Sequence, residues 1–152
     1  MSVNSKYLKP EPQPGQIIRF DYLWKREEER GAMQGMKDRP CVVLAKTTCE
    51  HTGAEAVIVC PITHSPPYED QECVRISKKD SRQMGLSKSE QWVKTDEANV
   101  VPWSDPGIIR ATPTKWLFGR VPKYAFEAIR QSVLDCSKKQ RLEMVNRSSF
   151  AP

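Results

Sequence analysis

The chain has 152 residues and a mass of 17.4 kDa, which leaves room for one ordinary domain with a hydrophobic core and little more. Apolar residues make up 38% of the sequence and charged residues 28%, and no stretch approaches the roughly 18 apolar residues of a membrane helix. The net charge of +5 and the pI near 9.0 favour a polyanionic partner only weakly, because many small proteins carry such a charge.

The cysteines and the first residues indicate a cytoplasmic protein. The five cysteines are odd in number, scattered and without a C-x-x-C pair, and three lie inside apolar runs, where a thiol behaves as a small hydrophobe. This pattern favours free thiols, which predicts that the protein resides in a reducing compartment. The first residues are polar and proline-rich, unlike a secretory signal. With two histidines and no carboxylate–histidine cluster at ligand spacing, the sequence predicts neither a metal site nor a cofactor.

The N-terminal part is predicted to be an arm, a strand and a long loop. Residues 1–13 are expected to form a flexible, extended arm because of their prolines. Residues 16–24 alternate between apolar and polar side chains, as a half-buried strand does. The apolar face of that strand carries Ile18, Phe20, Tyr22 and Trp24. Residues 25–38 form a long charged loop with one helical turn, and loops of this length are often functional.

Two buried strands and several short elements are expected next. Residues 40–45 form an unbroken apolar run, which must be covered on both faces. Residues 56–60 form a second such run, which Pro61-Ile62-Thr63-His64 completes and the following prolines end. Ser77, with Asp80 three residues later, predicts the start of a short helix. Further strands are expected over residues 73–76, 91–95 and 99–103.

The C-terminal part is predicted to be one amphipathic helix and a polar tail. Pro122 suits the first position of this helix. An apolar stripe at helical spacing follows, formed by Phe126, Ile129, Val133 and Cys136. The folded domain is expected over residues 14–137, and residues 138–152 are expected to form a polar tail that frays. The predicted class is mainly β with helices (α+β), as a small curled sheet or barrel with a C-terminal amphipathic helix.

Three sequence blocks occur in an informative order. They are Pro14-Gly15-Gln16-Ile17-Ile18, Arg39-Pro40-Cys41-Val42-Val43-Leu44 and Val59-Cys60-Pro61-Ile62-Thr63. In this order and spacing they resemble the PemK/MazF toxins, which open with a P-G-x-[IV]-[IV] strand. In those toxins a loop ends in R-P-x-V-V-[LI] and a later strand ends in P-[IV]-T. The segments Lys94-Thr95-Asp96-Glu97 and Phe118-Gly119-Arg120 extend the resemblance with less force.

The resemblance implies a fold, an activity and partners. The implied fold is a small SH3-like β-barrel with appended helices. The implied activity is that of a toxin endoribonuclease, an mRNA interferase that cuts single-stranded RNA at short sequence motifs without a metal ion. A homodimer is implied as well, together with a cognate antitoxin that occupies the RNA groove.

Arg39 and Thr63 are the positions that the resemblance marks as the active site. In metal-free RNA cleavage the 2′-hydroxyl attacks the neighbouring phosphorus, which requires a base, an acid and cationic donors for the charged intermediate. Arginine suits the last task because its guanidinium stays protonated and forks onto two phosphate oxygens. From the residues alone, a surface arginine or a partner for Asp38 is the simpler interpretation of Arg39. Thr63 alone is simply a β-branched strand residue.

The sequence leaves the general base open among three residues. Many family members carry a Glu-Gln-x-Gly stretch before the arginine, and residues 32–38 of this chain (A-M-Q-G-M-K-D) lack that glutamate. His64, Asp38 and Asp96 are the candidates. Histidine titrates near neutrality, so His64 suits either the acid or the base role. Adjacent strand residues face opposite ways, however, so His64 shares a site with Thr63 only where the strand has ended.

Four charged residues are predicted to bind RNA, namely Lys37, Asp38, Lys94 and Asp96. Lys94 and Asp96 share one strand face, so Lys94 would hold a phosphate while Asp96 orients a base or reads a nucleobase edge. A solvated charge pair is an equal alternative. The alternative function is a catalytically inactive SH3-like module that binds RNA or protein, which the missing glutamate favours.

Overall fold

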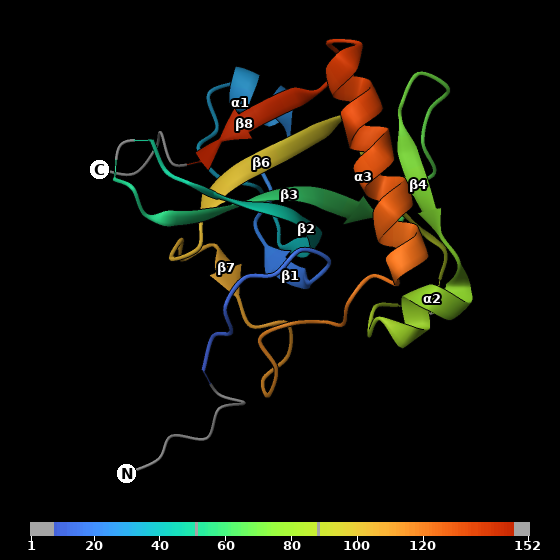
Figure 1. Ribbon diagram of the computed structural model, residues 1–152, viewed down its shortest axis with the longest axis horizontal. Coiled ribbons are helices and arrows are strands. Elements are labelled where there is room, and N and C mark those ends of the chain that lie inside the picture. Colours follow the sequence, from blue (N-terminus) through green and yellow to red (C-terminus); the bar gives the residue numbers. More distant parts are fainter. Residues whose placement is uncertain (1–7, 51, 88, 148–152) are drawn as a thin grey trace.

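The computed structural model describes residues 8–50, 52–87 and 89–147, which fold as an α+β domain built mostly of antiparallel strands (Figure 1). In chain order the elements are β1 (Ile17–Phe20), α1 (Lys25–Glu29), β2 (Arg39–Thr48), β3 (Glu55–Thr63), β4 (Cys73–Ile76), α2 (Lys78–Gln83), β5 (Gln91–Lys94), β6 (Glu97–Pro102), β7 (Ile108–Ile109), α3 (Lys123–Lys138) and β8 (Glu143–Asn146). The predicted α+β class is therefore confirmed. The start of the expected arm, residues 1–7, and the end of the expected tail, residues 148–152, lie outside the described residues.

A long hairpin of β2 and β3 forms the centre of the sheet. β2 pairs antiparallel with β3 on one side and with β1 on the other, and β1 also pairs with β7. β3 changes partner along its length, because residues 56–59 pair with β6 whereas Ile62 and Thr63 pair with β5. β5 in turn pairs with β4, and β6 pairs in parallel with β8. The last residues of β3 therefore leave the strands beside which it began.

Among the described residues the strands do not close into a barrel. Their pairings follow an open path from β4 through β5, β3, β2 and β1 to β7, with β6 and β8 as a branch from β3. The SH3-like barrel that the resemblance implied is therefore not confirmed. The physical reason is that β3 divides its hydrogen bonds between β5 and β6, while β4 and β7 at the two ends do not pair with each other.

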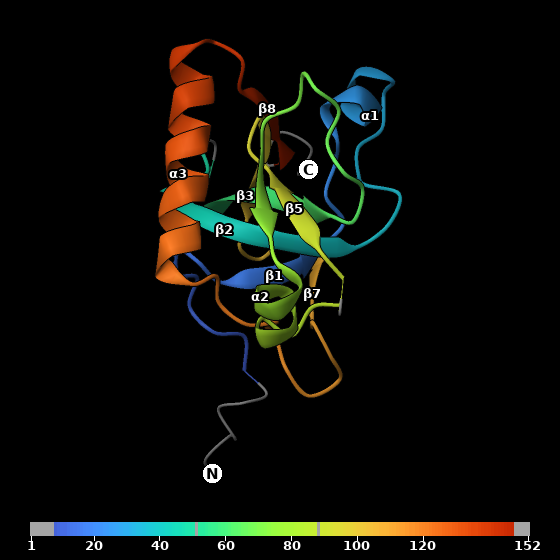
Figure 2. The ribbon, with the colours of Figure 1, turned by 90° about the vertical axis from the view of Figure 1, so that its right-hand side faces the viewer.

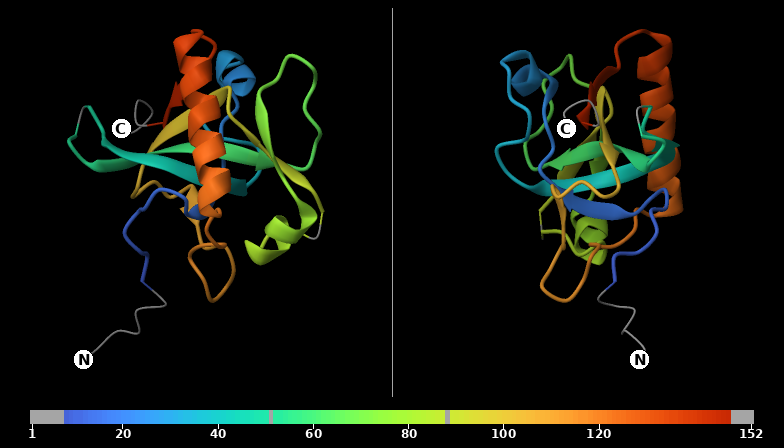
Figure 3. Two further views of the ribbon diagram at one scale, coloured as in Figure 1. Left: turned by 45° about the vertical axis from the view of Figure 1, so that its right-hand side comes forward. Right: turned by 90° about the vertical axis from the view of Figure 1, so that its left-hand side faces the viewer.

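Two hydrophobic clusters cover the two faces of the central hairpin. Val42 and Cys60 belong to one cluster, and Val43 and Val59 belong to the other. α3 packs on the first cluster through Ile129, and Figure 2 and the right view of Figure 3 show α3 and α1 on opposite sides of the sheet. Because both faces of β2 are covered, its sequence is an unbroken apolar run instead of an alternating one.

The C-terminal segment is ordered where the sequence predicts fraying. Residues 143–146 form β8, which lies parallel to β6. Beyond it Arg147 is buried, and its guanidinium donates hydrogen bonds to Asp21 O at 2.8 Å and to Asp21 Oδ1 at 3.1 Å. The expectation of fraying was wrong for these residues. Their partners, β6 and Asp21, are distant in sequence, so no local sequence pattern predicts the contacts.

Candidate active site

The ends of three strands meet at one edge of the sheet. β2 begins at Arg39 and β3 ends at Thr63. The pairing of these strands ends with Cys41 and Pro61, which lie two residues from Arg39 and from Thr63 respectively. β5 brings Lys94 to the same edge, because β5 pairs with the last two residues of β3. Local strand pairing alone therefore gathers residues from three distant stretches of the sequence.

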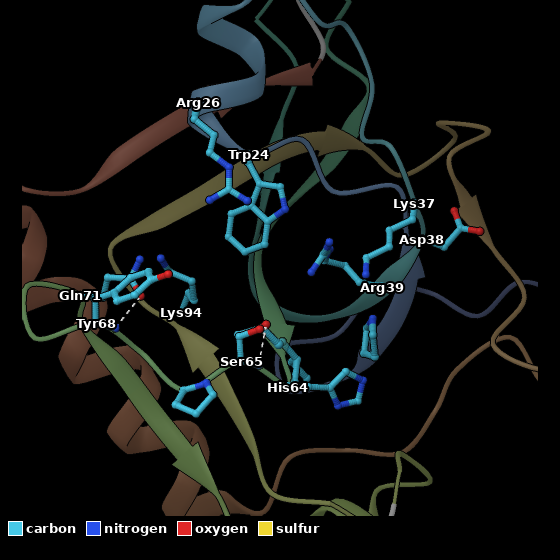
Figure 4. Close-up of a pocket in the computed structure, with 14 residues that line it drawn as sticks. Trp24, Arg26, Lys37, Asp38, Arg39, His64, Ser65, Tyr68, Gln71 and Lys94 are labelled. Carbon is cyan, nitrogen blue, oxygen red and sulfur yellow. Dashed lines mark hydrogen bonds between the residues drawn. The ribbon is translucent and has the colours of Figure 1, made fainter.

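A cavity of about 740 Å³ opens at this edge (Figure 4). We call it the Arg39 groove. It is lined by Trp24, Arg26, Lys37, Asp38, Arg39, Pro40, Ile62, Thr63, His64, Ser65, Pro66, Tyr68, Gln71 and Lys94. Four of these side chains are lysine or arginine, and one is a carboxylate. The excess of cations gives the groove a positive field, which attracts a polyanion such as a nucleic-acid backbone.

Trp24 is the contact that three of the cations share. The centroid of its ring lies 4.9 Å from Arg39 Cζ, 5.2 Å from Arg26 Cζ and 5.6 Å from Lys94 Nζ. The electron-rich face of an indole attracts cations at these separations. Trp24 therefore holds together three positive charges that would otherwise repel one another.

The backbone around Trp24 is turned into the groove by a side chain from β6. Asn99 is fully buried, its Oδ1 accepts the Leu23 N–H at 2.9 Å, and its Nδ2 donates to Leu23 O at 2.8 Å. These bonds replace the strand pairing that would have continued after Phe20. The predicted strand over residues 16–24 accordingly ends at Phe20, and Trp24 precedes α1 instead of extending β1.

The guanidinium of Arg39 makes no hydrogen bond or ion pair with any residue that the structure describes. Its Nε is buried without an acceptor. Burial lowers the pKa of Arg39 from its ordinary value, although an arginine side chain stays protonated in proteins. A partly desolvated cation without a counter-ion interacts more strongly with an incoming anion than a solvated one does. Arg39 is therefore well placed to bind an incoming anion.

The loop that carries Lys37 and Arg39 is fixed at Gly35. The Gly35 N–H donates to Asp21 O at 3.2 Å. A Cβ at this position would lie 2.1 Å from Tyr22 O and 2.6 Å from Asp21 O, so no other residue fits without moving the backbone. The close approach sets where the chain runs on its way to β2.

Thr63 and His64 line the groove together. β3 ends at Thr63, so the alternation of a strand no longer separates the two residues. The Ser65 N–H donates to Thr63 Oγ1 at 3.1 Å, which closes a turn directly after the strand. This bond uses the oxygen as an acceptor and leaves the Thr63 hydroxyl hydrogen to donate. His64 is exposed at the mouth of the groove.

Comparison with protein-family models identifies the chain. The model described as PemK-like, MazF-like toxin of type II toxin-antitoxin system matches residues 14–134. The chain belongs to the PemK/MazF family. Members of this family are toxins of type II systems and generally endoribonucleases, they have antitoxin partners, and they typically form dimers. A comparison with curated proteins gave no match.

In this PemK/MazF member the two predicted aspartates lie less centrally than the cations. Asp38 lines the groove but turns away from its centre (Figure 4), and it forms an ion pair with Arg19 at 3.6 Å. Asp96 lies outside the lining. Its Oδ1 is 3.6 Å from Lys94 Nζ and accepts no hydrogen bond from the described residues, and its Oδ2 accepts the Glu72 N–H at 3.3 Å.

Among the eight lining residues that the sequence did not predict for the site are four large polar or aromatic ones, namely Trp24, Arg26, Tyr68 and Gln71. Trp24 was placed on the buried face of a strand, and Arg26 was placed in a loop without a role. Tyr68 carries a signal that could have been used, because a large aromatic ring after two prolines in a polar segment suits stacking against a nucleobase. It is 76% exposed in the structure.

The other described residues offer no metal site and no membrane-spanning helix. Histidine, cysteine, aspartate and glutamate do not gather there in groups of three or more that could hold a metal ion. Of the helices in the described ranges, none is both long and apolar enough to cross a membrane.

Proposed function

We propose that this chain is a toxin endoribonuclease that binds single-stranded RNA in the Arg39 groove and cleaves it without a metal ion. The observation that carries the proposal is the charge of the groove, which has four lysines and arginines against one carboxylate. At its centre the buried Nε of Arg39 has no acceptor among the described residues. Family membership supplies the expected reaction class. The exposed ring of Tyr68 at the rim supplies a surface on which an unpaired base stacks.

The reaction we propose is attack of a ribose 2′-hydroxyl on the adjacent phosphorus. The new bond joins O2′ to phosphorus and the broken bond joins phosphorus to O5′, so the products are a 2′,3′-cyclic phosphate and a 5′-hydroxyl. A base takes the 2′-hydroxyl proton, and an acid protonates the leaving O5′. Charge develops on the two non-bridging phosphate oxygens, where preorganised donors have their largest effect.

Each groove residue has a proposed role in this reaction. Arg39 forks onto the non-bridging oxygens, and Thr63 donates its hydroxyl to the same phosphate. His64, the histidine of the lining, transfers the proton as base or acid. Lys37 and Lys94 hold flanking phosphates.

Asp96 and Asp38 do not contact the reacting phosphate in this proposal. Asp96 lies beside Lys94, so it orients the ammonium group of that lysine. Asp38 lies at the rim beside Arg19 and contacts the RNA chain there.

The partners follow from the family and from the charge of the groove. We propose that the chain works in the cytoplasm as a homodimer and that its antitoxin covers the groove with an acidic segment, because carboxylates complement the four cations. The antitoxin should then compete with RNA for the same site. Measuring RNA binding with and without a purified antitoxin tests this competition directly.

The proposed reaction is tested with a long single-stranded RNA in EDTA. Purified protein should give discrete fragments that end in cyclic phosphate, and a 2′-deoxy substitution at a mapped cleavage position should abolish the cut there. Arg39→Ala should lose cleavage, whereas Arg75→Ala, which removes an exposed arginine paired with Glu90 outside the groove, should retain it.

Two results would contradict the proposal. Intact RNA at high protein concentration, with binding retained, would make the chain a binding module without catalysis. An unchanged cut pattern in Arg39→Ala would assign the activity to a contaminating nuclease.

A further inference from the structure

A second aromatic surface lies far from the groove and carries the N-terminal segment. Trp103 directly follows β6, and Trp116 lies in the connection between β7 and α3. The Trp103 Nε1–H donates to Pro10 O at 3.1 Å. Lys9 Nζ lies 4.5 Å from the centroid of the Trp103 ring and 5.7 Å from that of Trp116, and it also donates to Trp103 O. Figure 1 shows this segment in dark blue, leading into β1.

The path of the segment is fixed by one buried side chain. Gln16 accepts the Gln13 N–H at its Oε1 at 2.8 Å, and its Nε2 donates to Glu11 O at 3.3 Å. Arg120 donates to Pro14 O at 2.8 Å. Residues 9–13 therefore lie along the domain without belonging to any helix or strand.

The sequence of the segment suits an extended conformation. Prolines occupy positions 10, 12 and 14, and each fixes its own φ while restricting the preceding residue to extended backbone. Such a segment loses little conformational entropy when it binds, which is the reason that aromatic grooves recognise proline-rich chains. The indole N–H of Trp103 on the Pro10 carbonyl supplies a directional bond of the kind such grooves use.

The surface also selects a positive charge. Lys9 lies over two indole faces, and Asp105 exerts an attraction on the same ammonium group. A ligand for this surface should therefore carry a lysine directly before a proline and a second proline two residues after the first, as Lys9, Pro10 and Pro12 do. A stacked nucleobase is the weaker match, because it carries no positive charge for Asp105 to attract.

We propose that the Trp103–Trp116 surface is a recognition site for a proline-rich segment with a lysine directly before its first proline, and that residues 8–13 occupy it within the same chain. Another protein that carries a segment of this chemistry binds there by displacing the arm. The backbone N–H of Trp103 donates to the carbonyl oxygen of Glu55, which is the first residue of β3. The Arg39 groove lies at Thr63, which is the last residue of β3. At about 3.3 Å per residue, the eight steps from Glu55 to Thr63 separate the two ends of β3 by roughly 26 Å.

The test uses the full chain and a synthetic peptide of residues 8–14. The probe is the indole N–H resonance of Trp103, assigned by its loss in Trp103→Phe. In a chain with Lys9→Ala and Pro10→Ala the docked arm is weakened, so the peptide should move this resonance back toward the wild-type position. The wild-type chain should bind the peptide more weakly, because a tethered arm competes at an effective concentration on the order of 1 mM; the factor is one plus the ratio of this concentration to the dissociation constant of the docked arm.

A matched peptide with alanine in place of lysine is the control, and it should bind several-fold more weakly than the parent peptide. The inference is overturned if the peptide gives no saturable shift in the weakened chain, or if both peptides bind equally. It is also overturned if an oligoribonucleotide moves the Trp103 resonance and the peptide does not. Should Trp103→Phe fail to fold, the comparison of the two peptides on the weakened chain still decides the matter. The readout is peptide binding and does not involve RNA cleavage, so the result tests this inference independently of the proposed function.

Discussion

Removing Arg147 should destabilise the domain strongly, although the residue lies beyond α3 and outside the 14–134 family match. Its guanidinium is 5% exposed, bonds Asp21 twice, and lies with Cζ 4.7 Å from the centroid of the Phe20 ring. Arg147→Ala leaves the Asp21 carboxylate, itself 16% exposed, without its cation. Breaking a buried pair in this way costs about 3–5 kcal/mol. We expect the lower end, about 3 kcal/mol, because Asp21 retains some contact with water.

The assay is urea unfolding followed by tryptophan fluorescence. With a slope of about 2 kcal/mol per molar urea, the midpoint should fall by about 1.5 M. Arg141→Ala is the matched control, because Arg141 pairs with Glu72 at 3.5 Å while both side chains are more than 40% exposed. That variant should stay within about 0.5 kcal/mol of the wild type.

The loss at Arg147 should also depend on pH. Burial raises the pKa of Asp21, and Arg147 acts in the opposite direction. Without Arg147 the pKa of Asp21 rises further, so protonation at acidic pH relieves the cost of the unpaired carboxylate. The loss should therefore be larger at pH 8 than at pH 4.5. A loss no greater than that of Arg141→Ala, or one that is equal at both pH values, would refute this account of the C-terminal segment.

Three further predictions concern the groove and its supports. Burial raises the pKa of Glu97, so the folded state binds this proton more tightly than the unfolded state, and the free energy of unfolding falls as pH rises from about 4.5 through the folded pKa. Glu97→Gln should flatten that slope in urea unfolding between pH 4.5 and 8, and an unchanged slope would exclude Glu97 as its source. Lys37→Ala should reduce the slope of log affinity against log salt for single-stranded RNA by about 0.7, the value for one phosphate contact, and an unchanged slope would remove Lys37 from the RNA path. Gly35→Ala places a Cβ 2.1 Å from Tyr22 O, which shifts the loop that leads to Arg39, so cleavage measured as kcat should fall about 10²-fold. Full activity in that variant would show that the loop adapts without moving Arg39.

Much of the fold follows from local sequence patterns. The apolar run that begins at Pro40 and the one that ends at Thr63 predicted two buried strands, which are β2 and β3, and Ser77 predicted the start of α2, where its side chain accepts the Asp80 N–H. These patterns work because burial on both faces and helix capping act within a few residues. The predicted apolar stripe of the last helix was likewise informative, since Ile129 is fully buried in α3.

The features that the sequence did not disclose depend on distant partners. The end of β1 is set by Asn99, which bonds Leu23 from 76 positions away. The same contact determines that Trp24 faces the groove and gathers its cations. β8 and Arg147 are ordered only because β6 and Asp21 lie beside them. Hydrophobic periodicity and secondary-structure propensity carry no information about such contacts. The sequence therefore predicted several charged residues of the groove but not the Trp24 indole that contacts three of its cations.

The central claim is that Arg39 stabilises the transition state of RNA cleavage. The most direct measurement is the single-turnover rate on one oligoribonucleotide in EDTA, for the wild type and for Arg39→Ala, with the affinity for a 2′-deoxy analogue measured alongside. We expect a rate about 10²–10³-fold lower in Arg39→Ala, the usual effect of losing one preorganised donor, with a much smaller change in affinity. An unchanged rate, or a loss that appears only in affinity, would contradict it.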